Sequence, residues 1–277
     1  MTPLCVRDIL AFHKIDRAVF DKLLAHGANP QMARNVVALF MWLDLIGIDV
    51  VNYVGGLRNH STIVMLVAEA EKILNCIRHD GIPASELRVE IPILSSLVSE
   101  NIDLCFFDFH KDVVVRGLAQ VLDGVGALIF DDKLQKLFRS HEATVRAAEE
   151  EARKRGSRAN LPRLPPELAK TYNPRLVSAS EDCRSMFITF SKGFPVGREE
   201  IVEYFTEKWG NCIERVMMER TATGITPMYG RIVFTSESFI GLVLNGERLV
   251  KFVINGRQLW ARKYVPRINK DGSSCEI

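Results

Sequence analysis

The eight residues PMYGRIVF, 227 to 234, decide how the C-terminal part of the chain folds. The alternate residues Gly230, Ile232 and Phe234 are small or apolar. The residues that alternate with them, which begin with Tyr229, include an aromatic ring and a cation. Alternation with a period of two is typical of a strand that buries one face of a sheet. The stretch therefore predicts a β-strand with one apolar face and one face that carries Tyr229 and Arg231.

The segments on either side of this strand, from Cys183 to Tyr264, extend the pattern. In chain order they predict a strand in SMFITF, a helix in REEIVEYFTEKWG, a strand in CIERVMME, the opening strand, a helix in SESFIGLVLNG and a strand pair in VKFVINGRQLWARKY. The Asn255-Gly256 pair in the last segment is typical of a tight hairpin turn. The order β-α-β-β-α-β predicts the split βαβ arrangement of the ferredoxin-like fold.

Residues 4–155 have a helical period instead. Apolar side chains recur at spacings near 3.6 in DILAFHKIDRAVFDKLLAHG, where Phe12 is assigned to the apolar face. The segment that follows Pro30, VVALFMWLDLIG, is apolar on most sides and is expected to be central and buried. The sequence thus predicts an α+β multidomain protein: an all-α helical domain (1–155), a proline-rich linker (156–182), a ferredoxin-like βαββαβ domain (183–267) and a disordered tail (268–277).

Two of the predicted strands carry the residue pattern of a known RNA-binding family. MFITFS, residues 186–191, matches the aliphatic-aromatic-aliphatic start of the family's first-strand hexamer and places an aromatic at Phe187. PMYGRIVF matches the third-strand octamer at positions three, four, six and eight, and departs from it at one, two and five, where Pro227 and Arg231 replace a basic and an aromatic residue. Residues 185–263 therefore resemble an RNA-recognition motif (RRM), a domain that stacks the bases of single-stranded RNA on such rings.

The resemblance implies a set of RNA-binding side chains on the open face of the sheet and near its ends. They are Phe187, Thr189, Tyr229, Arg231, Trp260, Arg262, Lys263 and Lys192. Phe187 and Tyr229 would stack on bases, and Arg231 would stack as a planar cation or contact a phosphate. Trp260 would either face the RNA or lie beneath the linker or the tail. The remaining cations would partly replace the phosphate contact that is lost at Pro227.

The distribution of charge agrees with a polyanion partner for the C-terminal part. Residues 1–155 contain 18 basic and 21 acidic side chains, a net charge of −3, whereas residues 183–267 contain 13 basic and 8 acidic ones, a net charge of +5. A basic excess attracts nucleic acid, although +5 is also found on ordinary soluble domains. The charge therefore supports RNA binding only in combination with the pattern of the strands.

The N-terminal segments AFHKIDR, VALFMWLD and GIDVV, together with the RRM-like segments, are similar to a plant group of RRM-containing proteins. The likeness covers nearly the whole chain and implies an RNA-binding protein, without a defined target. MTPLCVRDIL lacks a signal-peptide pattern, no apolar run reaches the roughly 20 residues of a membrane helix, and the cysteines are scattered singly. We therefore expect an intracellular protein without a membrane partner, in the nucleus or the cytoplasm, with the nucleus slightly favoured.

A protein-interaction scaffold is the main alternative function. Some RRM-like domains have lost RNA binding and contact proteins through their helical face or a covered sheet, and the departures at Pro227 and Arg231 agree with that alternative. If an acid of the helical half pairs with Arg231, the open face of the sheet binds something other than RNA. Residues 1–155 would bind a protein partner, self-associate, or simply form a helical core.

Catalysis is not expected. The nearest acid–histidine neighbours are His79 with Asp80 and Asp108 with His110, and each pair is better explained as a helix end or a surface pair. The chain contains no HExxH, GxSxG or phosphate-binding glycine loop with lysine, and no CxxC pair. The sequence thus predicts a non-catalytic protein with no cofactor and no metal, which holds two or three nucleotides of single-stranded RNA by stacking.

Overall fold

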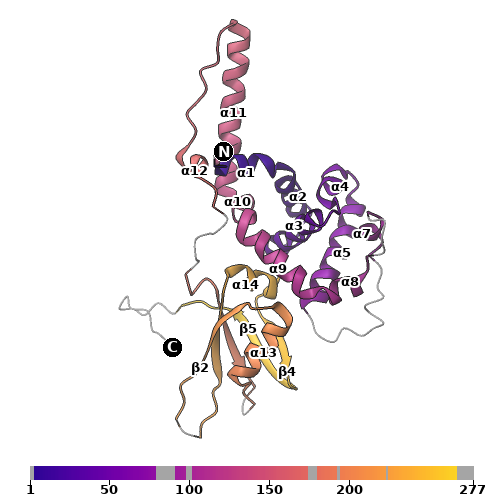
Figure 1. The fold of residues 1–277 in the computed structure, drawn as a ribbon, viewed down its shortest axis with the longest axis vertical. Coiled ribbons are helices and arrows are strands. Elements are labelled where there is room, and N and C mark those ends of the chain that lie inside the picture. Colours follow the sequence, from indigo (N-terminus) through magenta and orange to yellow (C-terminus); the bar gives the residue numbers. More distant parts are fainter. Residues whose placement is uncertain are drawn as a thin grey trace.

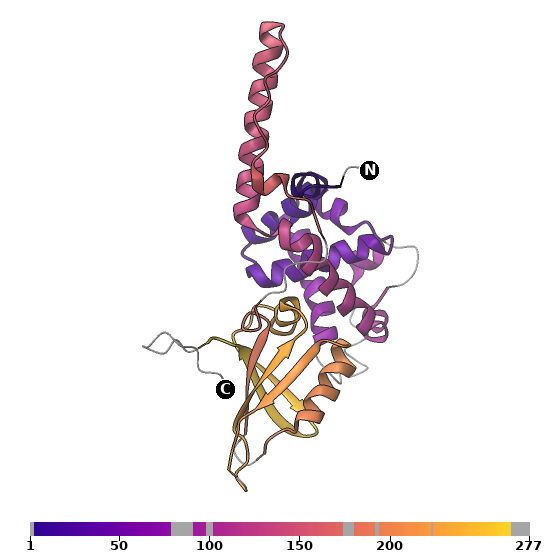
Figure 2. The ribbon, with the colours of Figure 1, turned by 60° about the vertical axis from the view of Figure 1, so that its left-hand side comes forward.

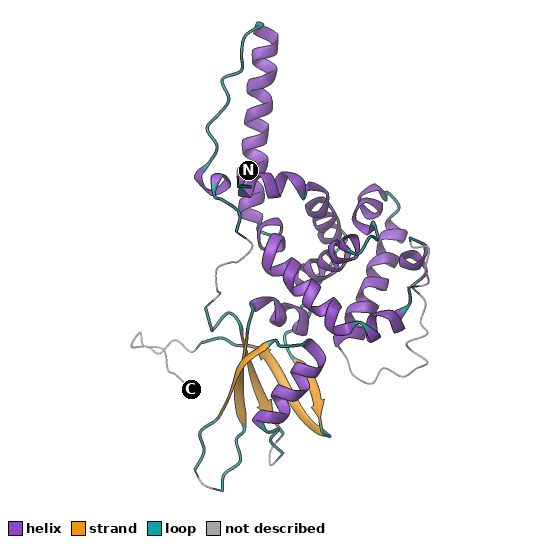
Figure 3. Ribbon diagram, in the orientation of Figure 1, coloured by secondary structure: helices purple, strands orange, loops and turns teal. Residues whose placement is uncertain are grey.

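The computed structural model describes residues 3–78, 91–97, 102–173, 180–191, 194–222 and 224–266. A helical N-terminal part lies above a second part that contains a β-sheet and two helices (Figure 1). All described strands belong to the second part (Figure 3). The protein is therefore an α+β protein with a helical N-terminal part, as the periods of the sequence predict.

Helices of widely different length form the N-terminal part. In chain order they are α1 (Val6–Phe12), α2 (Lys14–Ala25), α3 (Pro30–Leu45), α4 (Val50–Gly56), α5 (His60–Arg78), α7 (Pro92–Ser96), α8 (Leu104–Phe109), α9 (Lys111–Val121), the π-helical turn η1 (Leu122–Gly126), α10 (Ala127–Ile129) and α11 (Asp132–Arg155). Helix α3 begins at the Asn29 cap, and its residues 36–43 are all buried. The expectation that this helix is central is confirmed.

The first expected helix is divided in two at His13. The backbone of His13 (φ −93°, ψ 29°) is not helical, and it separates α1 from α2. Helix α1 packs on α10, α11 and α12 (Pro166–Ala169), whereas α2 packs on α3 and α4. Phe12 is 82% exposed, so its assignment to the apolar face was wrong. The apolar spacing suits one continuous helix, but packing against two different sets of helices divides it.

Helix α11 projects away from the rest of the molecule in both views (Figures 1 and 2). It begins at Asp131, whose side chain accepts hydrogen bonds from the backbone N–H groups of Lys133 and Leu134. It ends at Gly156, which adopts a left-handed φ of 61° that favours glycine. The expected helix start at Asp131 is confirmed.

The expected linker packs against the N-terminus of the chain. The Val6 N–H donates to the Lys170 carbonyl (2.9 Å), and the Tyr172 N–H donates to the Leu4 carbonyl (2.8 Å). Leu168 of the short helix α12 is fully buried in a small apolar cluster that also contains Val6, Leu10 and Phe138. This part of the linker is therefore ordered by contacts with α1 and α11.

The second part is a five-stranded antiparallel sheet with two helices. Its elements are β1 (Ser185–Phe190), α13 (Arg198–Trp209), β2 (Ile213–Met218), β3 (Tyr229–Phe234), α14 (Glu237–Leu244), β4 (Val250–Ile254) and β5 (Arg257–Lys263). The strands lie in the order β2-β3-β1-β5-β4, so β1 has β3 on one side and β5 on the other. Asn255 and Gly256, both with positive φ, form the expected hairpin turn between β4 and β5.

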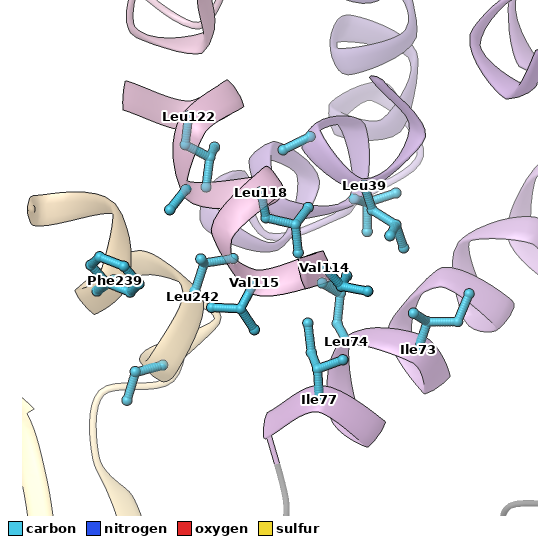
Figure 4. Packing of buried hydrophobic residues seen from close by; sticks show 14 of the residues in the cluster. Leu39, Ile73, Leu74, Ile77, Val114, Val115, Leu118, Leu122, Phe239 and Leu242 are labelled. Atoms are coloured by element: carbon cyan, nitrogen blue, oxygen red, sulfur yellow. The ribbon is translucent and has the colours of Figure 1, made fainter. Parts of the chain in front are cut away.

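One continuous apolar core joins the two parts of the protein. Helix α14 packs on α3, α9 and η1, and α13 packs on α9. In Figure 4, Leu242 of α14 lies beside Val115 of α9, and Phe239, Leu118 and Leu122 belong to the same cluster. The helices that cover one face of the sheet are therefore themselves covered by the helical part.

Buried polar groups of the helical part hold the C-terminal end of α14. Asn35, which is fully buried, donates to the Gly241 carbonyl (3.0 Å) and to Oδ1 of Asn245 (2.7 Å). Arg78, 4% exposed, donates through Nη2 to the Leu244 carbonyl (3.4 Å). The Gly241 and Leu244 carbonyls also accept hydrogen bonds from the backbone N–H groups of Asn245 and Glu247, so Asn35 and Arg78 add bonds that hold this end of α14 to the helical part.

The N-terminal end of α14 is held in the same way. Oδ1 of Asp123 in η1 accepts hydrogen bonds from the hydroxyls of Ser236 and Ser238, each at 2.5 Å. Between the two ends, a Cβ on Gly241 would lie 2.6 Å from the side chain of Gln31 on α3. Helix α14 therefore contacts the helical part along its length, and the opposite face of the sheet is the one that these helices do not cover.

Candidate nucleic-acid interface

The uncovered face of the sheet is defined by the register of its strands. Phe187 on β1 lies opposite Arg231 on β3 and Arg262 on β5, and Thr189 lies opposite Tyr229 and Trp260. Directly opposed residues of antiparallel strands project from the same face. We call these six side chains, Phe187, Thr189, Tyr229, Arg231, Trp260 and Arg262, the open face. The register thus brings together six of the eight residues predicted from the sequence.

Two aromatic rings form the centre of the open face. The Phe187 and Tyr229 rings are stacked, with centroids 5.7 Å apart and planes inclined by 27°, and both residues are partly exposed. The Arg262 guanidinium lies over the Phe187 ring, 4.8 Å from its centroid. A ring pair beside a cation offers a flat surface for a base and a positive charge for a phosphate.

A third ring lies on the side of the face toward β4. Trp260 is 37% exposed, and the ammonium group of Lys251 lies 5.7 Å from its ring centroid. Lys251 stands opposite Trp260 in the register of β4 and β5. Sequence reasoning did not assign Lys251 to the interface, although the alternation of the hairpin strand around Phe252 places it on the same face as Trp260.

Gly230 is required for the packing of β3. It lies between Tyr229 and Arg231, on the side of the sheet that faces α13 and α14, and it is buried. A Cβ at this position would lie 2.7 Å from the carbonyl oxygen of Met217 and 3.2 Å from the Ile188 side chain. The glycine therefore lets the three strands approach while the neighbouring side chains project from the open face.

Arg231 is not a free cation on this face. It is only 8% exposed, and its Nη2 donates to Oδ1 of Asp182 at 2.7 Å and lies 3.5 Å from Oε1 of Glu181. Its guanidinium lies over the Tyr264 ring, 4.0 Å from the centroid. The interpretation of Arg231 as a solvent-facing stacking cation was wrong. The chain segments before β1 and after β5 cover it, and the two acids belong to the linker rather than to the helical part.

Glu181 and Asp182, which we call the acidic clasp, hold more than one cation. Arg215 of β2 also pairs with Glu181, and this hydrogen bond raises the pKa of Arg215 above its usual value. Val233, the next residue of β3 on the same side as Arg231, is fully buried. The end of the open face nearest the linker is thus covered. The sequence contains no local signal for the clasp, because Arg215 and Arg231 lie 34 and 49 residues away from their acidic partners along the chain.

The two remaining predicted residues do not join the open face. Lys263 lies opposite Met186, on the side of the sheet that faces the helices, and its Nζ pairs with Oε1 of Glu237 at 2.8 Å. The cation expected at the C-terminal end of the sheet is thus paired within the chain. Lys192 lies outside the described residues.

The described histidines and acids do not gather into a metal site. Among the described residues there is no group of three or more His, Cys, Asp or Glu side chains that could hold a metal ion. The acid–histidine contact that sequence reasoning missed is Nδ1 of His13 with Oδ2 of Asp16, at 2.8 Å. Asp108 lies 4.0 Å from Lys111, and His79 and Asp80 lie outside the described residues.

No described helix is by itself long and apolar enough to span a membrane. The bent pair formed by Lys111–Ile129 and Asp132–Arg155 passes that test by length and composition when the two are taken together.

Comparisons of the chain with protein-family models, with curated proteins and with solved structures find no match. The function must therefore be argued from the geometry of the open face.

Proposed function

We propose that residues 183–267 form an RNA-recognition motif with the ferredoxin-like arrangement, and that the protein binds single-stranded RNA on the open face without catalysis. The observation that carries the proposal is the stacked Phe187–Tyr229 pair with the Arg262 guanidinium over Phe187. Base–aromatic stacking contributes roughly 1–3 kcal/mol per base and tolerates any base. Two or three nucleotides would lie across these rings and Trp260.

The position of the helical part supports the choice of this face. Helices α13 and α14 are packed against the helical part, and both ends of α14 are hydrogen-bonded to it. The surface through which a protein would contact the helices of the sheet domain is thus occupied within the same chain. The open face remains accessible at Phe187, Tyr229, Trp260 and Arg262.

A protein-interaction scaffold is the second candidate, and the burial of Arg231 favours it. Arg231 would have been the cation that compensates for the missing aromatic of the octamer, and the acidic clasp holds it. In that case the partner would be a protein, bound through residues 1–155, where large apolar side chains such as Phe12 and Phe109 are exposed. The same helical part could also self-associate.

A titration of the whole chain with a fluorescent single-stranded RNA at two salt concentrations tests the proposal. The whole chain is needed because the sheet domain shares its core with the helical part. We expect Phe187→Ala and Tyr229→Ala each to weaken binding by about 5- to 100-fold, which corresponds to the loss of one stacked base. Tyr53→Ala removes an exposed ring from α4, away from the open face, and serves as the control, with unchanged affinity expected.

Two outcomes contradict RNA binding. One is a wild-type chain that shows no salt-dependent binding, since phosphate contacts release counterions. The other is binding by the Phe187 and Tyr229 variants that equals that of the wild type.

A further inference from the structure

A large cleft lies between the helical part and the sheet domain. It has a volume of about 1370 Å³ and is bordered by α3, by the segment from η1 to the start of α11, and by α14. The start of β1 and the end of β5 close it on the side of the sheet, through residues such as Arg184 and Arg262. The cleft therefore opens next to the end of the strand that carries Trp260 and Arg262 on the open face.

The acidic side chains that line the cleft already have partners. They are Asp123, Asp131, Asp132, Glu237 and Glu247. Asp123 accepts from two serine hydroxyls and Asp131 from two backbone N–H groups, whereas the other three pair with Arg17, Lys263 and Arg78 at 2.6, 2.8 and 3.0 Å. Three of the five acids are thus paired with a cation, and neutral donors hold the other two, Asp123 and Asp131.

Four cations of the lining have no acidic partner. They are Arg34, Lys133, Arg248 and Arg262, and none forms an ion pair with a described residue. In addition, the Nε atoms of Arg34 and Arg184 are shielded from solvent and donate to no described group. A buried donor without an acceptor costs about 1–3 kcal/mol, so an acceptor placed beside either guanidinium would be stabilising. Together with the four cations, these donors favour an anionic ligand rich in oxygen.

Arg262 connects the cleft with the open face. Its guanidinium lies over the Phe187 ring, and the same residue lines the cleft. An RNA strand that leaves Phe187 past Arg262 therefore enters the cleft toward Arg34 and Arg248.

We propose that this cleft binds the phosphodiester backbone of the RNA strand whose bases stack on the open face. This inference rests on the proposed function and deepens it. The helical part is then not only a support for the sheet: Arg34 on α3 and Lys133 on α11 contact phosphates, and the binding site is longer than the two or three nucleotides of one sheet. A longer RNA is then preferred because the binding site extends from the sheet onto the helical part.

The experiment compares a short RNA of about 3 nucleotides, which covers the rings only, with an RNA of about 12 nucleotides, which reaches the cleft. The test protein is the full chain with Arg34→Gln and Arg248→Gln. Arg58→Gln with Arg163→Gln removes the same charge from exposed positions outside the cleft and is the control. Thermal unfolding of each variant is measured first, and the exposed Arg248→Gln alone replaces the double variant if that variant does not fold.

We expect the cleft variant to bind the long RNA about tenfold more weakly, and the short RNA as tightly as the wild type does. The slope of log affinity against log salt for the long RNA decreases by about 1.4, because roughly 0.7 of a counterion is released for each of the two phosphate contacts that are lost. The control variant keeps the affinity of the wild type for the long RNA within about twofold.

Three results overturn the cleft proposal while the proposed function stands: a wild type that binds both RNAs equally tightly, a cleft variant that binds the long RNA as the wild type does, or a cleft variant that loses affinity for both RNAs equally. A wild type that binds neither RNA overturns the proposed function, and the cleft proposal with it.

Discussion

The two ends of the open face differ although the same strands form both. At one end, the Tyr229 ring is partly exposed and stacks on Phe187, and Arg262 lies over the Phe187 ring. From Arg231, which lies opposite Phe187, toward the other end, β3 is covered: the acidic clasp holds Arg231, Tyr264 lies over it, and Val233 is fully buried.

The difference between the two ends shows that strand alternation determines which face a side chain occupies, but not whether a ligand can reach it. The chain segments that flank the sheet decide access, since they contribute Glu181, Asp182 and Tyr264. A sequence motif that is matched along one strand therefore predicts a larger binding surface than the folded protein leaves accessible.

The largest expected effect is on stability, and it comes from a substitution in β3, the strand that carries both Tyr229 and Arg231. In Gly230→Ala, the added Cβ meets the Met217 carbonyl and the Ile188 side chain, so β3 must shift. We expect the free energy of unfolding to fall by about 1–3 kcal/mol, the usual range for an overpacked core, in urea unfolding measurements. Gly56→Ala, where a Cβ meets nothing within 4 Å, is the control and should change stability by no more than about 0.5 kcal/mol. Equal effects of the two substitutions would mean that β3 does not need glycine.

The next prediction concerns the part of the open face that the acidic clasp covers. Replacement of the acidic clasp by Glu181→Gln and Asp182→Asn removes two negative charges and releases Arg231 and Arg215. We expect single-stranded RNA to bind several-fold more tightly at low salt, because two cations become available for phosphates. Since both acids are partly exposed, the stability should fall by only about 1 kcal/mol.

The control for the clasp is Glu203→Gln with Glu207→Gln, which makes the same change of charge on the exposed side of α13. If that control strengthens RNA binding as much as the clasp variant does, the gain reflects net charge rather than access to Arg231. If the clasp variant has the affinity of the wild type, the covered end takes no part in RNA binding.

A smaller effect distinguishes the two faces of the sheet through neighbouring residues of β5. Arg262 lies on the open face over Phe187, whereas Lys263 faces the helices and pairs with Glu237. We expect Arg262→Gln to weaken RNA binding about fivefold, through the loss of one stacking or phosphate contact, and Lys263→Gln to change it by less than about twofold. Fluorescence anisotropy of the two variants side by side measures this difference. A larger effect at Lys263 would reverse the assignment of the faces.

The smallest expected effect concerns two thiols of the sheet domain, one exposed and one buried. Burial raises the pKa of the Cys212 thiol to about 12, whereas Cys183 beside the acidic clasp is exposed. The thiolate is the reactive form, so iodoacetamide at pH 8 should label Cys183 and leave Cys212 unmodified until the protein unfolds. Bound RNA should slow the labelling of Cys183 only modestly, because the acidic clasp lies at the edge of the open face. Rapid labelling of Cys212 in the native protein would contradict its burial.

The same pKa shift predicts how stability depends on pH. The pKa of Cys212 is higher in the folded chain than its value of 9.0 in an unfolded one, so the unfolded state releases its proton first. The stabilising contribution is complete below about pH 9 and decreases as the pH rises from there toward 12. Urea unfolding of the wild type and of Cys212→Ala between pH 8 and about 10.5 measures it, and parallel curves for the two proteins would exclude this contribution.

Much of the fold could be predicted because it depends on local patterns. The alternation in β1 and β3, the Asn255-Gly256 turn, the Ser236 cap of α14 and the Asp131 cap of α11 all appear where the sequence places them. These features depend on backbone geometry and on neighbours within a few residues, so the sequence alone contains the information.

The predictions that were wrong concern contacts between distant segments. Phe12 loses its place in the core because α1 and α2 pack on different helices, and Arg231 is covered because Glu181, Asp182 and Tyr264 lie over it. Lys263 is a further example, because its charge at the end of the sheet is paired with Glu237 of α14, 26 residues away along the chain.

By itself, the sequence determined the order of helices and strands and the pair of rings at Phe187 and Tyr229, because period and turn chemistry are local properties. The tertiary structure decided that the helices of the sheet domain pack against the helical part, that the acidic clasp covers one end of the open face, and that unpaired cations from both parts line one cleft. These features depend on side chains that lie close in space and far apart along the chain, and no periodic pattern records such contacts.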